Sequence, residues 1–258
     1  MKIVVCVKFV PDSTAARTFA PDRTVDRAGV DGLLSELDEN AVEQALQIAA
    51  DGDTEVTLLT VGPQEARAAI TKGLQMGADA GVHVVDDAIH GADALGTSAI
   101  LAAALGRLEH DIVLCGMAST DGGMSVVPAM LAERLGLPQL TFAAEVTIDG
   151  DTVRIRRDGE AATEVAEAAL PVVLSVTDQA NEPRYPSFKG IMGAKKKPVQ
   201  TWSLADLGLS ADEVGGVAAW TTVDEIEARP PRSAGKVVVD DGTAADQLVD
   251  FLAEQKFV

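Results

Sequence analysis

The chain has 258 residues, 47% of them hydrophobic, so it can bury a sizeable core in one main domain with an appendage. Its 40 acidic and 21 basic residues give a net charge of −19, which disfavours binding to nucleic acids or anionic membrane surfaces. The apolar run near the amino terminus is too short for a signal peptide, and no run approaches the roughly 20 apolar residues that span a bilayer. We therefore expect a soluble, cytoplasmic protein.

Near-continuous apolar runs, rich in valine and isoleucine, recur at residues 3–7, 56–61, 82–85, 112–115 and 172–176. Such runs are typical of strands buried on both faces. Alanine-rich helical patterns lie between them, at residues 39–50, 63–76, 92–108 and 125–135. Alternating strands and helices predict an α/β fold with a doubly wound, Rossmann-like parallel sheet. In this fold a ligand binds at the carboxyl ends of the strands, where the strand order reverses.

The second half of the chain has a different pattern. Segments 144–148 and 152–156 flank Asp149-Gly150, a pair that favours a two-residue turn, and they predict a small antiparallel ribbon. After Lys197 little periodicity is found until a helical pattern at residues 243–255. A long irregular segment predicts an extended C-terminal arm that wraps around a partner subunit, and a disordered connector is the alternative.

A glycine-rich segment, Gly116-Met-Ala-Ser-Thr-Asp-Gly-Gly-Met-Ser125, joins the fourth predicted strand to a helix. Glycine allows backbone N–H groups to approach a ligand, nearby hydroxyl groups can donate hydrogen bonds, and the helix presents its positive end. A phosphate group fits this arrangement, but an ordinary strand–loop–helix connection has the same pattern. The P-loop spacing and the dinucleotide fingerprint are both missing.

No set of side chains points to catalysis or to a metal. The two cysteines, Cys6 and Cys115, lie in separate strands without metal or redox spacing, and we expect reduced core thiols. The histidines form no triad. Glu39 and Glu43 lie four residues apart on a predicted helix and are expected to face solvent. A nucleotide hydrolase is the weakest hypothesis, because the glycine-rich segment has no general base or metal ligands.

Residues 181–197 contain two prolines and two glycines, which exclude a central strand and a long helix. Apolar side chains on a surface connector indicate contact with another molecule, and the lysine run favours an acidic partner. A solvated loop with a lysine tail is the alternative. The candidates for this contact are Arg184, Tyr185, Phe188, Ile191, Met192, Lys195, Lys196 and Lys197.

This segment resembles the beta subunit of electron transfer flavoprotein. The family has Asn-Glu-Pro-Arg-Tyr, a short apolar stretch, Ile-Met and a lysine run, and the chain repeats these at residues 181–197. Residues 2–8, 76–79, 153–160 and 170–176 also match, so the resemblance covers nearly the whole chain and weakens only at 208–235. It implies a nucleotide-binding domain over residues 1–180, a partner-recognition loop over 181–198, and a C-terminal arm and helix over 199–258 that pack on an alpha subunit.

The resemblance implies an electron carrier subunit without catalytic residues of its own. FAD, held mainly by the alpha subunit of a heterodimer, would accept electrons from acyl-CoA dehydrogenases and related flavin dehydrogenases of fatty acid oxidation. It would pass them toward the respiratory chain through a quinone oxidoreductase. The resemblance also implies a structural AMP. Its contacts would be Cys6, Ser35, Asp38, Val61, Gly116, Thr120, Asp121, Gly122, Gly123, Met124, Ser125, Val126 and Val127.

Some positions differ from the family pattern. Hydroxyl and amide residues of the family's phosphate loop are replaced here by Gly123, Met124 and Val126, so backbone N–H groups are expected to be the main phosphate contacts. The family leucine that anchors in a hydrophobic pocket of the dehydrogenase corresponds to Phe188. A stand-alone nucleotide-binding regulatory protein of the same architecture is the alternative function, because a fold does not determine a function.

Overall fold

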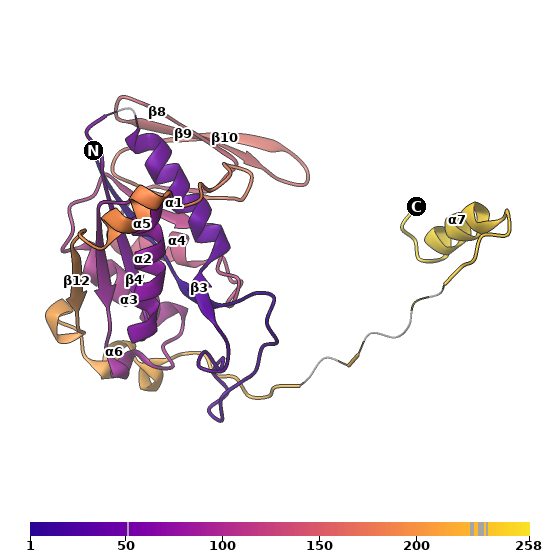
Figure 1. Cartoon of the computed structure of the whole chain (residues 1–258), viewed down its shortest axis with the longest axis horizontal. Coiled ribbons are helices and arrows are strands. Elements are labelled where there is room, and N and C mark those ends of the chain that lie inside the picture. Colours follow the sequence, from indigo (N-terminus) through magenta and orange to yellow (C-terminus); the bar gives the residue numbers. More distant parts are fainter. Residues whose placement is uncertain (51, 228–229, 232–234, 236) are drawn as a thin grey trace. The chain divides into compact units, whose positions relative to one another are not determined.

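The structure is a computed structural model that describes residues 1–50, 52–227, 230–231, 235 and 237–258. Residues Met1–Val223 form one compact unit, and residues Asp224–Val258 form a second. The first unit contains the sheets and most helices (Figure 1). Among the described residues, no helix has the length and apolar character needed to cross a membrane.

The main sheet has seven strands in the order β12-β5-β4-β1-β6-β11-β7, and every neighbouring pair is parallel. From β1 the chain passes to β4 on one side and later returns to β6 on the other, so the strand order reverses at β1. This confirms the predicted doubly wound sheet. The strands are β1 (Lys2–Cys6), β4 (Glu55–Val61), β5 (Ala80–Val84), β6 (Ile112–Gly116), β7 (Gln139–Ala143), β11 (Val172–Val176) and β12 (Val199–Trp202).

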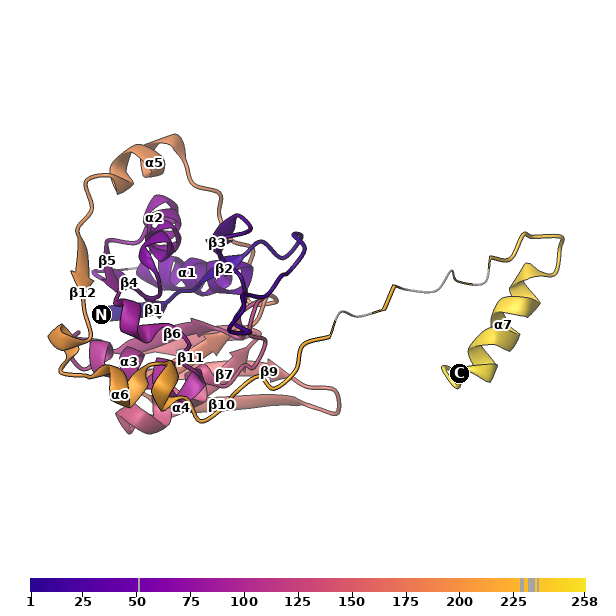
Figure 2. The same cartoon turned by 90° about the horizontal axis from the view of Figure 1, so that it is seen from below.

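Helices cover both faces of this sheet, as Figure 2 shows. One face packs against α1 (Glu36–Ala49) and α2 (Arg67–Met76), and the other against α3 (Ala94–Leu105) and α4 (Val127–Leu135). The strands β6 and β11 are buried at every position, which explains their continuous apolar sequences. The two helical layers therefore enclose two hydrophobic cores, one on each face.

A second sheet is antiparallel and contains β8 (Glu145–Asp149), β9 (Thr152–Asp158) and β10 (Thr163–Ala169). The predicted ribbon corresponds to β8 and β9, whereas β10 was not predicted. Val153 and Ile155 are buried, and Arg154 and Arg156 alternate with them and form ion pairs with glutamates of the neighbouring strands. A short pair, β2 (Phe9–Pro11) and β3 (Gly32–Leu34), completes the strands of the described chain.

The prediction of an irregular chain from Lys197 to residue 243 was wrong in its first part. Strand β12 pairs with β5, and short helices follow it: η3 (Ala205–Leu207), α6 (Ala211–Val214) and η4 (Gly216–Ala218). Leu204 and Val214 are buried in the core on the α3 face. Each of these elements has only three or four residues, which is too few for a recognisable periodicity.

The second unit contains the predicted C-terminal helix, α7 (Ala244–Glu254). Leu248 and Phe251 are exposed and lie three residues apart, which places them on the same face of the helix. None of the α7 residues is buried. A short helix with an exposed apolar face is typical of a segment that packs against a partner.

Candidate nucleotide site and recognition loop

A cavity of about 360 Å³ lies at the carboxyl ends of β1, β4 and β6. Its wall includes Cys6 from β1, Val61 from β4 and Gly116 from β6. This is the point where the strand order reverses, which is the place that the predicted topology gave for a ligand. The volume lies at the lower end of the range for small-molecule sites, and the wall is mainly apolar with a few polar groups.

The structure brings most of the predicted nucleotide contacts together in this cavity. Four of them, Ser35, Thr120, Asp121 and Gly123, do not line it. Sequence reasoning missed Lys8, which follows β1, and Asp93, which caps α3, as well as Thr97 and Thr221. The position of Asp93 could have been recognised in the sequence, because an aspartate before a helical pattern is a typical N-cap. The predicted residues that line the cavity are Cys6, Asp38, Val61, Gly116, Gly122, Met124, Ser125, Val126 and Val127.

The loop between β6 and α4 presents backbone donors to the cavity. Gly123 and Ser125 have left-handed backbone conformations, with φ of 64° and 58°. Within the described chain, the N–H groups of residues 125, 126 and 127 donate to no protein acceptor. Val126 precedes α4 and gives it no side-chain cap. Three adjacent free donors at a helix N-terminus are suited to an anion such as a phosphate.

Asp121, which the resemblance predicts as an AMP contact, does not line the cavity. Its side chain is only 2% exposed, and its carboxylate accepts hydrogen bonds from Lys8 Nζ at 2.9 Å and from Arg27 Nη2 at 2.5 Å. Burial raises the pKa of Asp121, but the two cations outweigh burial and hold the pKa well below its usual range. The ionised Asp121 therefore ties the glycine-rich loop to Lys8 and Arg27, outside the cavity wall.

Asp38 lies in the first turn of α1 and is one of the residues that line the cavity. One oxygen accepts a hydrogen bond from the backbone N–H of Lys8 at 2.8 Å, and the N–H of Gly116 also donates to this carboxyl group. Burial outweighs these hydrogen bonds and raises the pKa of Asp38 to about 7. Burial beside the cavity therefore favours the neutral form of this carboxyl group.

Gly116 has no room for a side chain. A Cβ atom there would lie 2.6 Å from Asp38 Oδ1 and 2.7 Å from the backbone oxygen of Leu37. We expect Gly116→Ala to lower the free energy of unfolding by about 1–3 kcal/mol, because the backbone of α1 must shift to make room. Denaturant unfolding measures the change. A matched control is Gly52→Ala, where a Cβ atom meets nothing within 4 Å, and equal effects of the two substitutions would contradict the expectation.

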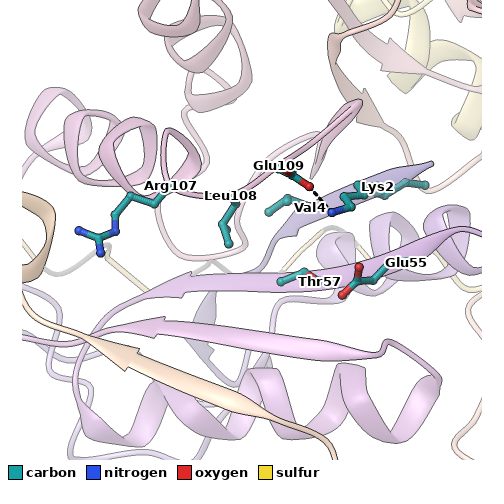
Figure 3. Close-up of a pocket in the computed structure, with 8 residues that line it drawn as sticks. Lys2, Val4, Glu55, Thr57, Arg107, Leu108 and Glu109 are labelled. Carbon is teal, nitrogen blue, oxygen red and sulfur yellow. Dashed lines mark hydrogen bonds and ion pairs between the residues drawn. The ribbon is translucent and has the colours of Figure 1, made fainter.

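A second cavity, of about 230 Å³, lies at the opposite edge of the sheet, near the amino ends of β1 and β4 (Figure 3). The Lys2 ammonium group points toward the Glu109 carboxylate and forms an ion pair with it. Glu55 and Arg107 also line this cavity. None of the predicted ligand residues lies here, so this cavity does not correspond to the predicted nucleotide site.

The recognition loop, residues 181–198, places its apolar side chains at the surface. Tyr185 is 92% exposed and Phe188 is 81% exposed, and Ile191 and Met192 are also exposed. Residues Phe188–Ala194 form a short helix, α5, which packs against α2, where the sequence had predicted an irregular loop. The side chain of Ser187 accepts a hydrogen bond from the N–H of Gly190 at 3.0 Å and caps this helix.

Two basic residues of the recognition loop have partners inside the chain. Arg184 forms an ion pair with Glu43 of α1. The Nζ atom of Lys197 donates to three backbone oxygens at the end of α2, at 2.5–3.1 Å. Lys195 and Lys196 are exposed. The expectation that Glu43 faces solvent was wrong, because Glu43 is 4% exposed beneath the loop.

The two cysteines and His83 are packed in the core. Cys6 and Cys115 are free, buried and directly opposite each other on β1 and β6. A hydrogen bond with Cys6, together with burial, raises the pKa of Cys115, which favours the neutral thiol. Burial lowers the pKa of His83, and its Nε2 lies 3.1 Å from the backbone oxygen of Gly62.

Comparisons with known proteins identify the family of this chain. Residues 22–207 match the electron transfer flavoprotein domain. The chain is 46% identical over 263 residues to the "Electron transfer flavoprotein subunit beta" of Mycobacterium tuberculosis, with 99% of each chain covered. It is 36% identical over 270 residues to the protein of the same name from Megasphaera elsdenii, with both chains fully covered.

A further relative is the "Caffeyl-CoA reductase-Etf complex subunit CarD" of Acetobacterium woodii, which is 34% identical over 257 residues. The alignment covers 99% of this chain and 97% of that protein. These relationships extend over both units and include the cavity and the recognition loop. The chain therefore belongs to the electron transfer flavoprotein family, as a beta subunit, and is an electron carrier component rather than a catalyst.

Proposed function

We propose that this chain pairs with an alpha subunit to form a heterodimer that carries electrons through FAD. The alpha subunit would hold most of the FAD, and this chain would close over one side of it. Electrons would come from acyl-CoA dehydrogenases or related flavin dehydrogenases and pass toward the respiratory chain through a quinone oxidoreductase, in the cytoplasmic compartment. The observation that carries the proposal is the identity of 46% to a beta subunit over almost the whole chain.

The ligand proposed for the cavity is a structural AMP. The volume of the cavity suits a mononucleotide, and the free N–H groups of residues 125–127 would receive the phosphate. Cys6, Asp38 and Val61 would contact the nucleoside, as predicted from the resemblance.

The recognition loop would dock to the electron donor. Tyr185, Phe188 and Met192 form an exposed apolar group on an otherwise acidic protein, and exposed apolar groups of this kind mark transient interfaces. Phe188 would be the anchor in a hydrophobic pocket of the dehydrogenase. Lys195 and Lys196 would favour an acidic rim around that pocket.

The Acetobacterium woodii relative favours a second candidate. Its name places it in a complex with a caffeyl-CoA reductase. By analogy, this chain would serve as the electron carrier of an acyl-CoA reductase complex, with the same recognition loop at the contact. Electron flow toward a reductase and electron uptake from a dehydrogenase are distinguished by assaying both directions with the purified heterodimer.

Co-expression with a candidate alpha subunit tests the central proposal. We expect a heterodimer that contains FAD and releases one AMP per dimer after denaturation, and this chain alone should retain AMP but no FAD. Chromatography of the released nucleotides measures both ligands. A stable homodimer that contains ATP or AMP and does not bind an alpha subunit would instead support the stand-alone regulatory protein.

A further inference from the structure

A polar stripe of α1 lies buried beneath the recognition loop. Asn40, Glu43 and Gln44 are at most 6% exposed, although all three side chains are polar. They lie three and four residues apart on α1 and therefore share one side of the helix. Burial of polar groups costs free energy unless each group has a partner. The partners of this stripe are residues of the recognition loop.

Glu43 makes the strongest of these contacts. Its Oε2 accepts hydrogen bonds from Arg184 Nε at 2.6 Å and from the backbone N–H of Arg184 at 3.2 Å. Its Oε1 accepts from Arg184 Nη2 at 2.9 Å and from Gln47 Nε2 at 3.1 Å. A bidentate contact between a carboxylate and a guanidinium group fixes direction as well as distance. Glu43 therefore orients both the side chain and the backbone of Arg184.

The ends of the recognition loop are held in a similar way. Asn40 Nδ2 donates to the backbone oxygen of Asn181 at 2.9 Å, and Asn181 Nδ2 donates to the backbone oxygen of Asn40 at 3.1 Å. At the other end, Lys197 is bonded to the end of α2. The exposed side chain of Tyr185 follows Arg184 directly. These contacts within the chain thus order the backbone beneath the exposed apolar side chains before any partner binds.

We propose that Glu43 is a positioning residue for electron-donor recognition, which acts through Arg184 to hold Tyr185 and Phe188 in the orientation that docks. This inference rests on the proposed docking function of the recognition loop. A recognition loop that is already ordered by contacts with α1 and α2 loses less conformational entropy on binding. Loss of the contact between Glu43 and Arg184 weakens docking and leaves the later electron-transfer step intact. KM therefore rises, whereas kcat does not change.

The test uses the complete heterodimer and an acyl-CoA dehydrogenase that is reduced by its acyl-CoA substrate. Glu43→Gln keeps the size of the side chain and removes its charge. We expect KM for the heterodimer to rise about tenfold, with kcat, flavin spectrum and nucleotide content unchanged. Arg184→Lys keeps the charge without the bidentate geometry and should give a similar rise. The control is Glu39→Gln, one turn earlier on α1, where the carboxylate pairs with Lys72 and KM should not change.

A double-mutant cycle with Phe188→Ala decides whether Glu43 acts through the loop. If it does, adding Glu43→Gln to Phe188→Ala leaves KM near the value of Phe188→Ala alone. Independent effects that multiply would overturn the inference, and so would a lower melting temperature with unchanged KM. If Glu43→Gln does not fold, Arg184→Lys takes its place in the cycle. An unchanged KM for Phe188→Ala alone would instead overturn the proposed docking function.

Discussion

Phe188→Ala should reduce kcat/KM for electron uptake from an acyl-CoA dehydrogenase by about 30-fold, which corresponds to about 2 kcal/mol. The Phe188 side chain is 81% exposed, so its removal does not disturb the packing of the hydrophobic core. In a small transient interface a few apolar anchors supply most of the binding free energy. Stopped-flow reduction of the heterodimer flavin at several protein concentrations measures the effect.

The flavin and AMP content of Phe188→Ala should equal that of the wild type, because the recognition loop shares no residue with the cavity proposed for AMP. Val165→Ala is the matched control, since Val165 is 66% exposed on β10, outside the recognition loop. It should leave the uptake kinetics unchanged. Wild-type kinetics for Phe188→Ala would show that another surface receives the donor.

The central part of the fold could be predicted because its strands are covered on both faces. Strands β6 and β11 are buried at all positions and leave continuous apolar runs in the sequence. The two edge strands, β7 and β12, do not leave such continuous apolar runs in the sequence. In β7 only two of five residues are buried, and β12 has none that is fully buried. An edge strand therefore has no apolar run that would distinguish it from a loop.

The topology predicts the position of the cavity at the carboxyl ends of β1, β4 and β6, but the sequence predicts only part of its lining. A doubly wound sheet brings the residues after β1, β4 and β6 to one place, whatever their identity. Asp121 and Glu43 could not be placed in this way. Their partners Arg27 and Arg184 lie 94 and 141 residues away along the chain, and the pairing depends on how the loops fold over the helices. Nothing in the local sequence distinguishes a paired carboxylate from a solvated one.

The recognition loop and α7 differ in how they are held in this chain. The recognition loop is tied to α1 and α2 by hydrogen bonds and an ion pair, so it is ordered before docking. By contrast, α7 exposes Leu248 and Phe251 and buries none of its residues. An ordered surface suits brief encounters with a donor, whereas an exposed apolar helix face suits the lasting contact with an alpha subunit that the resemblance implies.

Asp38→Asn should change how stability depends on pH. The pKa of Asp38 is about 7 in the folded chain, against 3.8 for a free aspartate side chain. Between these values the folded state binds a proton that the unfolded state lacks, so stability falls as pH rises from about 4 to about 7, by at most about 1.4 kcal/mol per pH unit. Asparagine cannot titrate and removes this dependence. Relative to wild type, the variant should therefore gain about 2.6 kcal/mol between pH 5 and pH 8.

Denaturant unfolding of the full chain at pH 5 and pH 8, at fixed ionic strength, measures this gain. At pH 5 the variant should be less stable by about 1 kcal/mol, because the amide nitrogen of asparagine cannot accept one of the two backbone hydrogen bonds. That loss is the same at both pH values, so it cancels in the comparison. Asp151→Asn is the control. Burial raises the pKa of Asp38, whereas Asp151 is exposed. Parallel pH profiles for wild type and Asp38→Asn would show that the carboxyl group is ionised in the folded chain over this whole range.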